Sequence, residues 1–178
     1  YALGSKKDFS SMFMSDNDGQ SSSFFKPKHH LIEHPEVKWK DGKKNFEINV
    51  MGPALVMKHF LPLLDKDQKS IFATLSAKVG SISDNRYGGW YSYRASKAAL
   101  NQMIKTASIE LKMKNKSAIC VAIHPGTVTS KLSKPFQKDN LKIQSNEESA
   151  KNITEVIVGL KASDSGLFFN WNGSIINW

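Results

Sequence analysis

The feature of this chain that most constrains its fold is a pair of short apolar segments, at residues 70–76 and 117–124. Each segment is bounded by polar residues and has the length of a strand, so each predicts a β-strand buried on both faces. The stretch between them, from about residue 90 to residue 114, predicts a long helix. A strand, a helix and a second strand at this spacing form a right-handed crossover, which makes the two strands parallel.

Two further helices and a third strand complete the pattern. Apolar positions at helical spacing predict a helix over residues 43–64, and Pro53 inside it removes one backbone donor. We therefore expect this helix to be kinked close to Asn49. A capping-box pattern that starts at Ser145 predicts another helix, and residues 167–171 predict another strand. Helices that alternate with strands predict an α/β fold with a parallel sheet, in which ligands gather at the carboxyl ends of the strands.

The composition limits the classes of partner. A chain of 178 residues that is 40% hydrophobic and 23% charged can bury one globular core. It has no apolar run of membrane-spanning length and does not start with a signal-peptide pattern, which predicts a cytoplasmic protein with no membrane partner. The single cysteine, Cys120, fits a buried strand thiol in a reducing compartment. The formal charge of +9 is scattered along the chain, so we expect a basic surface and no nucleic-acid partner.

Tyr93 and Lys97 lie one helical turn apart in the alanine-rich part of the long helix. Residues at this spacing share a helix face, so a lysine ammonium can stabilise the ionised phenol and lower the tyrosine pKa from its usual value of about 10. A phenol tuned in this way is a usable general acid or base. By itself the pair has a plainer interpretation, which is a lysine extended along a helix surface. The neighbouring segments decide between a catalytic pair and a plain helix surface.

Three blocks resemble parts of one enzyme family, in the same order along the chain. They match its active-site strand, loop and helix, a helix with an active-site asparagine, and a loop beside the nicotinamide: residues 75–97, 46–53 and 124–128. The sequence thus resembles the short-chain dehydrogenase/reductases, and within them the C-factor-like branch. Residues 166–173 resemble the closing strand and turn of that branch, so the resemblance extends from about residue 43 to residue 178.

The resemblance implies a Rossmann-like, doubly wound parallel sheet. It also implies an NAD(P)(H)-dependent oxidoreductase that reduces a carbonyl or oxidises a secondary alcohol of a small molecule. In the implied mechanism Tyr93 donates a proton to the substrate oxygen as hydride arrives, while Lys97 lowers the tyrosine pKa and binds the nicotinamide ribose. Asn49 sustains a proton relay, and a serine bonds the developing alkoxide. Besides Tyr93 and Lys97, the implied cofactor contacts are Pro125, Gly126, the backbone amide of Val128, and Ser130.

Three departures from the family pattern bear on this implication. Ala77 occupies the place of the usual second serine, so Ser76, or Ser81 just beyond it, would have to bond the alkoxide. Losing one such donor costs roughly a hundredfold or more in rate. Ser130 stands where the family usually has a threonine. The turn Gly-x-x-x-Gly-x-Gly, whose backbone approaches the cofactor pyrophosphate, occurs nowhere in the sequence.

The missing glycine turn predicts a chain that is truncated or divergent at its amino terminus. Residues 43–178 correspond to the carboxyl half of the Rossmann domain, and residues 1–42 form a divergent or poorly ordered segment. The sequence is then either a fragment of a longer enzyme or a truncated paralogue with half of the dinucleotide contacts missing. Related enzymes pair through the helices corresponding to residues 43–64 and 90–114, which implies a homodimer or homotetramer.

Two other classes of function remain open. The first is a catalytically inactive paralogue that acts as a binding or dimer-forming protein. The second is a metallohydrolase, because His30, Glu33 and His34 match the inverted zinc-protease pattern H-x-x-E-H. Pro35 argues against it, since the residue before a proline is pushed out of the helical region. We therefore expect no metal site.

Overall fold

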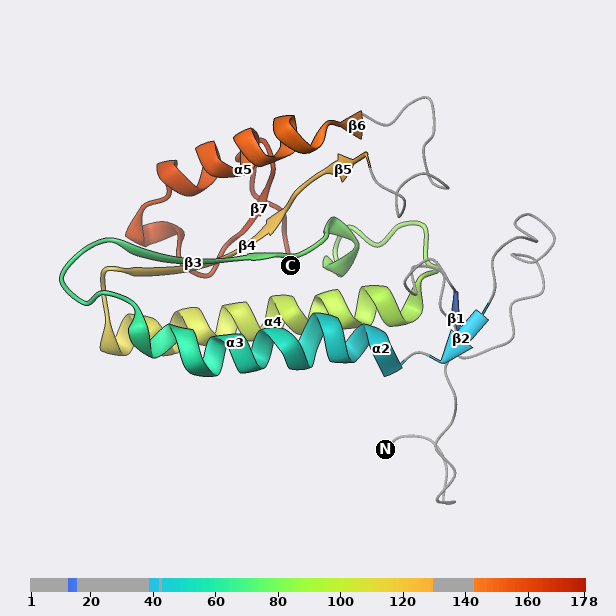
Figure 1. Ribbon diagram of the computed structural model, residues 1–178, viewed down its shortest axis with the longest axis horizontal. Helices are drawn as coiled ribbons and strands as arrows, with labels where there is room; N and C mark the ends of the chain where they lie inside the picture. Colours follow the sequence, from blue (N-terminus) through green and yellow to red (C-terminus); the bar gives the residue numbers. More distant parts are fainter. Residues whose placement is uncertain (1–12, 16–38, 42, 130–142) are drawn as a thin grey trace, which may run out of the picture.

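The computed structural model describes residues 13–15, 39–41, 43–129 and 143–178 (Figure 1). Two short strands, β1 (Phe13–Ser15) and β2 (Trp39–Asp41), pair with each other antiparallel. The remaining described elements belong to the part of the chain that starts at residue 43. The division of the chain at residue 42 stays a prediction, because most of the residues before it lie outside the described part.

The centre of the fold is a sheet of three parallel strands, in the order β3 (Ser70–Leu75), β4 (Ala118–His124) and β7 (Phe168–Asn170). β3 pairs with β4 along its whole length, with Ser70 beside Ala118, and β7 pairs with the carboxyl end of β4. β4 therefore has a partner on both sides and is buried from end to end apart from its last residue. The three predicted strands are confirmed. The expected burial on both faces holds for β4 but is wrong for β3, where Leu75 is 55% exposed, because β3 pairs with only one strand among the described residues.

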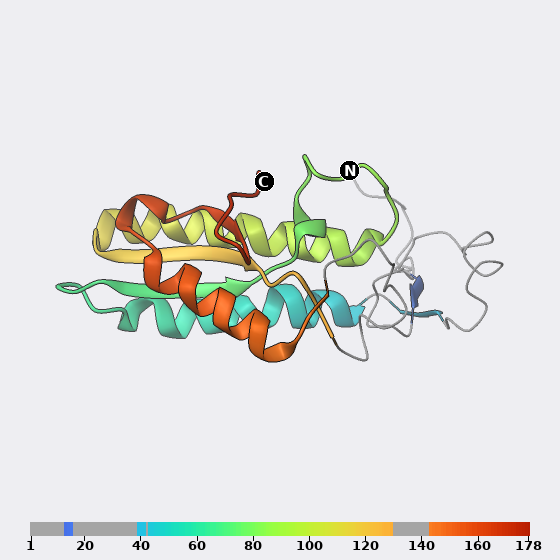
Figure 2. The ribbon, with the colours of Figure 1, turned by 90° about the horizontal axis from the view of Figure 1, so that it is seen from above.

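Helices cover both faces of this sheet. α3 (Gly52–Phe60) and α4 (Tyr91–Lys114) lie on one face, and α5 (Asn146–Gly159) lies on the other (Figures 1 and 2). Side chains of β4 alternate between the two layers: Cys120 belongs to the core cluster that includes residues of α4, while Val121 belongs to the cluster packed against α5. The doubly wound α/β arrangement is thus confirmed.

The helix predicted over residues 43–64 is interrupted. It begins as α2 (Lys43–Phe46), passes through a π-helical segment (Glu47–Met51), and resumes as α3. The Gly52 N–H donates to the carbonyl five residues back, which is the π-helical pattern. Pro53 has no N–H to donate to the carbonyl of Asn49, so the ordinary helical bond is impossible there. The disturbance expected near Asn49 is therefore a π-helical segment that contains Asn49.

The remaining described elements are short. Two paired strands, β5 (Thr127–Val128) and β6 (Ile143–Gln144), follow β4. Ser145 caps α5 as predicted, with its hydroxyl oxygen accepting the Glu148 N–H at 3.1 Å. The described residues also include three 3-10 turns: Leu61–Leu63, η3 (Lys78–Gly80) and Ala162–Asp164. Among the described helices, none is long and apolar enough to cross a bilayer.

The edge of the sheet at β7 is closed by the end of the chain. Ile175 forms an antiparallel bridge with Phe169, and the Ile176 N–H donates to the Phe168 carbonyl at 2.8 Å. The Trp178 ring stacks on Phe168, with ring centroids 5.4 Å apart. The last residues of the chain therefore form part of the core on the α4 side of the sheet.

Candidate active site

The predicted site residues lie at the carboxyl edge of the sheet. Ser76 directly follows β3, and Pro125 directly follows β4. Tyr93 and Lys97 lie in the first two turns of α4, which pack against η3 in the loop after β3. Since the ends of parallel strands in an open α/β sheet form the usual ligand crevice, the structure places these residues where the sequence predicted them.

Lys97 is half-buried between α4 and β3. Its ammonium donates to the carbonyl of Leu75 at 3.2 Å. Burial lowers the pKa of Lys97 to about 8, because a charged ammonium loses hydration there. Gly80 allows this close packing: a β-carbon at Gly80 would lie 2.8 Å from the Cβ of Lys97. A lysine with this pKa exchanges its proton readily near neutral pH.

Tyr93 differs from the expectation in one respect. The resemblance implied that Lys97 lowers the pKa of the phenol, whereas burial raises the pKa of Tyr93 above its usual value. The physical reason is that the phenol is desolvated, while the Lys97 ammonium is directed to the Leu75 carbonyl. The phenol of this structure therefore holds its proton more firmly than a free tyrosine does.

Two asparagines connect the interrupted helix to the helix of Tyr93. Asn45 donates to the Ser92 hydroxyl at 3.0 Å, and Asn49 donates to the Ser96 hydroxyl at 3.2 Å. Ser96 in turn donates to the backbone carbonyl of Tyr93 at 2.9 Å. Asn49 is thus connected to the Tyr93 backbone through a single side chain, that of Ser96. Sequence analysis missed Asn45, although the matched spacing of the two asparagines and the two serines gave a signal.

The hydroxyls of both candidate serines already have acceptors. Ser76 is 3% exposed and donates to the amide oxygen of Asn101 at 2.6 Å. Ser81 donates to the backbone carbonyl of Asn177 at 2.5 Å. Ala77, which lies between them and is itself buried, offers no hydrogen-bond donor in its side chain. The assignment of the alkoxide donor to Ser76 or Ser81 stays a prediction, and either serine would first have to release its present partner.

The loop after β4 is held by buried amide groups. Gly126 has a φ of +80°, a left-handed conformation that favours glycine. The carbonyl of Pro125 accepts hydrogen bonds from the side-chain amide of Gln144 at 3.2 Å and from the hydroxyl of Ser149 at 3.1 Å. Gln144 is fully buried, and its amide oxygen accepts a bond from Asn152 at 2.7 Å. The sequence did not predict the role of Gln144. Ser130, a predicted cofactor contact, lies outside the described residues.

The loop after β3 is held by one cation. The Arg94 guanidinium donates to the carbonyls of Val79, Gly88 and Gly89 at 3.1 to 3.2 Å. It also lies over the Trp90 ring, 5.6 Å from the centroid. Gly88, Gly89 and Trp90 all have left-handed backbone, with φ values of 64°, 68° and 51°. Arg94 therefore fixes a turn that a non-glycine residue enters only at a cost.

These residues fit one half of a dinucleotide. The half-buried Tyr93 phenol and Lys97 ammonium share one edge of the sheet with the Pro125–Val128 backbone, and these groups are suited to a ribose and a carboxamide. The pyrophosphate half has no matching glycine turn in this sequence. Metal ligands are not grouped in the described part of the chain, where no three His, Cys, Asp or Glu side chains come together. His30, Glu33 and His34 lie outside the described residues.

Comparison with known proteins identifies the family. The family model described as short chain dehydrogenase matches residues 27–141. The chain belongs to this family. C-signal of Myxococcus xanthus is 32% identical over 143 residues, which cover 80% of this chain and 82% of that protein. The 1-hydroxy-2-glutathionyl-2-methyl-3-butene dehydrogenase of Rhodococcus sp. is 32% identical over 136 residues, covering 76% of this chain and 58% of the enzyme.

Solved structures agree with this assignment. Carbonyl reductase Sniffer of D. melanogaster superposes with a TM-score of 0.66 at 28% identity, covering 75% of this chain and 55% of that chain. An NADPH-bound carbonyl reductase from chicken fatty liver superposes with a TM-score of 0.64 at 31% identity, with the same two coverages of 75% and 55%. The short-chain dehydrogenase fold is therefore confirmed, and the chain spans little more than half of these reductases.

Proposed function

We propose that this chain carries the catalytic half of an NAD(P)(H)-dependent oxidoreductase that reduces a carbonyl or oxidises a secondary alcohol of a small molecule. The observation that carries the proposal is the placement of Tyr93 and Lys97 beside the strand ends, in a chain that belongs to the short-chain dehydrogenase family. When bound, the nicotinamide cofactor supplies or accepts the hydride. The similarity to an NADPH-bound carbonyl reductase supports the reduction of carbonyls.

Tyr93 acts as the general acid in the direction of reduction. Its half-buried phenol is fully protonated at neutral pH, because its pKa is raised. It donates that proton to the substrate oxygen as negative charge develops there. The Lys97 ammonium, whose pKa is about 8, holds the ribose hydroxyls, then returns a proton to the Tyr93 phenolate, and the resulting amine takes up a proton from solvent. Asn49 connects this pair to the interrupted helix through Ser96.

The remaining proposed contacts belong to the loop after β4. Pro125, Gly126 and the backbone amide of Val128 bind the nicotinamide side of NAD or NADP, and Ser130 extends this contact. The buried Gln144 holds the Pro125 carbonyl and so fixes the course of the loop. Ser76 or Ser81 bonds the developing alkoxide.

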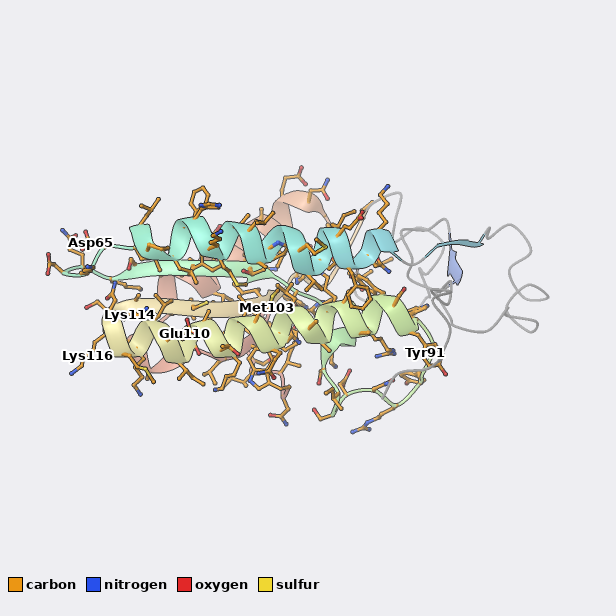
Figure 3. The ribbon with its side chains drawn as sticks, turned by 90° about the horizontal axis from the view of Figure 1, so that it is seen from below. Asp65, Tyr91, Met103, Glu110, Lys114 and Lys116 are labelled. Carbon is orange, nitrogen blue, oxygen red and sulfur yellow. The ribbon has the colours of Figure 1, made fainter. Side chains whose placement is uncertain are left out.

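Titration of the 178-residue chain with NADPH and NADH tests cofactor binding. We expect cofactor fluorescence to change saturably as the chain binds it. The affinity for cofactor should fall at least about tenfold in Lys97→Ala, because a charge-assisted hydrogen bond is lost. Lys116→Ala is the matched control, since Lys116 is exposed near the opposite end of α4 from Tyr91 (Figure 3). Equal affinities of the wild type and Lys97→Ala would show that Lys97 does not bind the cofactor.

A second candidate function is favoured by Ala77. A chain whose alkoxide donor is replaced, and whose nearby serine hydroxyls already have acceptors, fits a catalytically inactive paralogue that acts as a binding or dimer-forming protein. Ala77→Ser separates the two functions. If the chain is an enzyme, the added donor should raise carbonyl reduction by roughly tenfold to a hundredfold. NADPH consumption that stays at the buffer rate in both forms would favour the inactive paralogue.

We propose further that the chain forms a homodimer or homotetramer through α3 and α4. These two helices lie side by side (Figures 1 and 3), with a groove of about 610 Å³ between them. Leu55 and Phe60 on α3 are 58% and 57% exposed, which is unusual for large apolar side chains. Light scattering should give at least twice the chain mass. Leu55→Glu should reduce it to the chain mass, whereas Lys151→Glu, on α5 at the other face of the sheet, should leave it unchanged.

A further inference from the structure

A second crevice lies beside the proposed active site and shares only Ser81 with its candidate residues. It has a volume of about 310 Å³, which is at the lower end of the range for small-molecule sites. One wall is the loop after β3 and the other is the end of the chain after β7. Its lining includes Lys78, Ser83, Arg86, Asn170, Ser174 and Asn177.

The two walls of the crevice are fixed to each other. Ser81 donates its hydroxyl hydrogen to the Asn177 carbonyl at 2.5 Å, and the Ser83 N–H donates to the Trp178 carbonyl at 3.3 Å. These contacts connect segments that are almost one hundred residues apart in the sequence. The crevice is therefore a preformed feature of the fold rather than a gap between independent loops.

The charges at the crevice favour an anion. Lys78 and Arg86 contribute two cations, and Asp84 contributes one carboxylate, whose Oδ1 lies 3.3 Å from the Lys78 ammonium. The Arg86 side chain is exposed at the crevice and makes no ion pair within the described part of the chain. A guanidinium presents a planar set of donors that matches the oxygens of a phosphate or a carboxylate. Lys78 can contact the same ligand if its ammonium leaves the Asp84 carboxylate.

His124 does not line the crevice but is the strand neighbour of Asn170, which does, and it carries a buried polar atom. His124 is the register partner of Asn170, so both side chains lie on the same face of the sheet. The Nδ1 atom of His124 is buried and has no hydrogen-bond partner among the described residues. Leaving such an atom unpaired costs roughly 1–3 kcal/mol. A water molecule between this atom and a bound ligand would satisfy it.

We propose that this crevice binds a small molecule through a phosphate or carboxylate group, with Arg86 and Lys78 contacting its oxygens. Hydroxyls and amides of Ser83, Ser174 and Asn170 line the remainder and suit the polar body of such a ligand. Asp84 limits the affinity, because it competes for Lys78. The site is separate from Tyr93 and Lys97, so it does not depend on the proposed hydride transfer.

The test is a titration of the 178-residue chain with sodium phosphate and, separately, with sodium succinate, against sodium chloride at matched ionic strength. The readout is the backbone amide chemical shift of Ser83 and Ser174. We expect saturable shifts with at least one anion, and an affinity that falls about fivefold or more in both Lys78→Gln and Arg86→Gln. Asp84→Asn should raise the affinity, because it frees Lys78. Lys112→Gln is the control and should match the wild type.

The outcomes separate the two sources of the anion. A stronger response to phosphate assigns the site to phosphomonoesters, and a stronger response to succinate assigns it to carboxylates. The proposal is overturned if neither anion shifts these amides beyond the chloride control. It is also overturned if Arg86→Gln binds as tightly as the wild type. Since Arg86 is exposed, its substitution leaves the core intact.

Discussion

The two loops at the carboxyl edge of the sheet are held in opposite ways. The loop after β3 is fixed by Arg94, which donates to three backbone carbonyls, two of them on the exposed Gly88 and Gly89. The loop after β4 is fixed by Gln144, a neutral amide that is fully buried. An exposed carbonyl that loses its donor returns to water, whereas a buried one stays unpaired. The part of the first loop at Gly88 and Gly89 can therefore change its course at little cost, whereas the second loop cannot.

The largest effect should come from Gly126→Ala in the rigid loop. The new β-carbon would lie too close to the side-chain nitrogen of Gln144 and 2.8 Å from the Trp171 ring, at a left-handed φ of +80°. We expect a loss of about 3 kcal/mol or more in the free energy of unfolding, measured by urea denaturation. Gly159→Ala is the control: it meets nothing within 4 Å and should be neutral or stabilising. Equal losses in both variants would contradict the rigidity of this loop.

The next largest effect concerns His124, the last residue of β4, which is influenced by the charges of Lys78 and Asp84 in the loop after β3. Burial, and then the nearby Lys78 charge, lower the pKa of His124 to about 4 from its usual value of 6.5, while Asp84 opposes this shift. The unfolded chain therefore takes up the proton first as the pH falls. Stability should be complete above pH 6.5 and should decrease by up to about 3 kcal/mol as the pH approaches 4.

The measurement for His124 is the urea midpoint between pH 7 and pH 4, in the wild type and in His124→Gln. The variant should lose less of its stability over this range, because its amide does not titrate. A wild-type curve parallel to that of the variant would show that His124 titrates normally. Burial and the Lys78 charge would then have no effect on the pKa of His124.

Gln144→Met tests the buried anchor directly. Methionine fills a similar volume but leaves the Asn152 amide without its acceptor and the Pro125 carbonyl with one donor fewer. We expect a loss of about 2 kcal/mol in the free energy of unfolding and a higher KM for cofactor. A stability loss with an unchanged KM would limit Gln144 to a structural role.

Arg94→Gln should have the smallest effect and sharpens the contrast. The released carbonyls of Gly88 and Gly89 can bond water, so we expect a loss below about 1 kcal/mol. Amide exchange across residues 86–90 should nevertheless become faster, because the left-handed turn is no longer held. A loss as large as that of Gln144→Met would remove the distinction between the two loops.

The sequence predicted the parts of this fold that depend on local patterns. The strands follow from their apolar runs, α4 from its helix-forming composition, and the start of α5 from the Ser145 cap. The pairing of Asn49 with Ser96 joins residues 47 apart, and the four-residue spacing within each helix does not show that the two helices meet there. The contact between Gln144 and Pro125, which are 19 residues apart, leaves no local pattern. The pKa of Tyr93 was expected in the wrong direction, because burial cannot be read from the spacing of two residues.

The central strand also carries a natural probe of local unfolding. Cys120 is the single cysteine of the sequence, lies in the middle of β4 with 0% exposure, and has a pKa raised by burial to about 12. A thiol reagent can reach it only when the packing between the sheet and α4 opens, because the Cys120 side chain belongs to the core cluster on that face. The rate at which such a reagent labels the unmodified protein therefore measures how often this core opens, without any engineered probe.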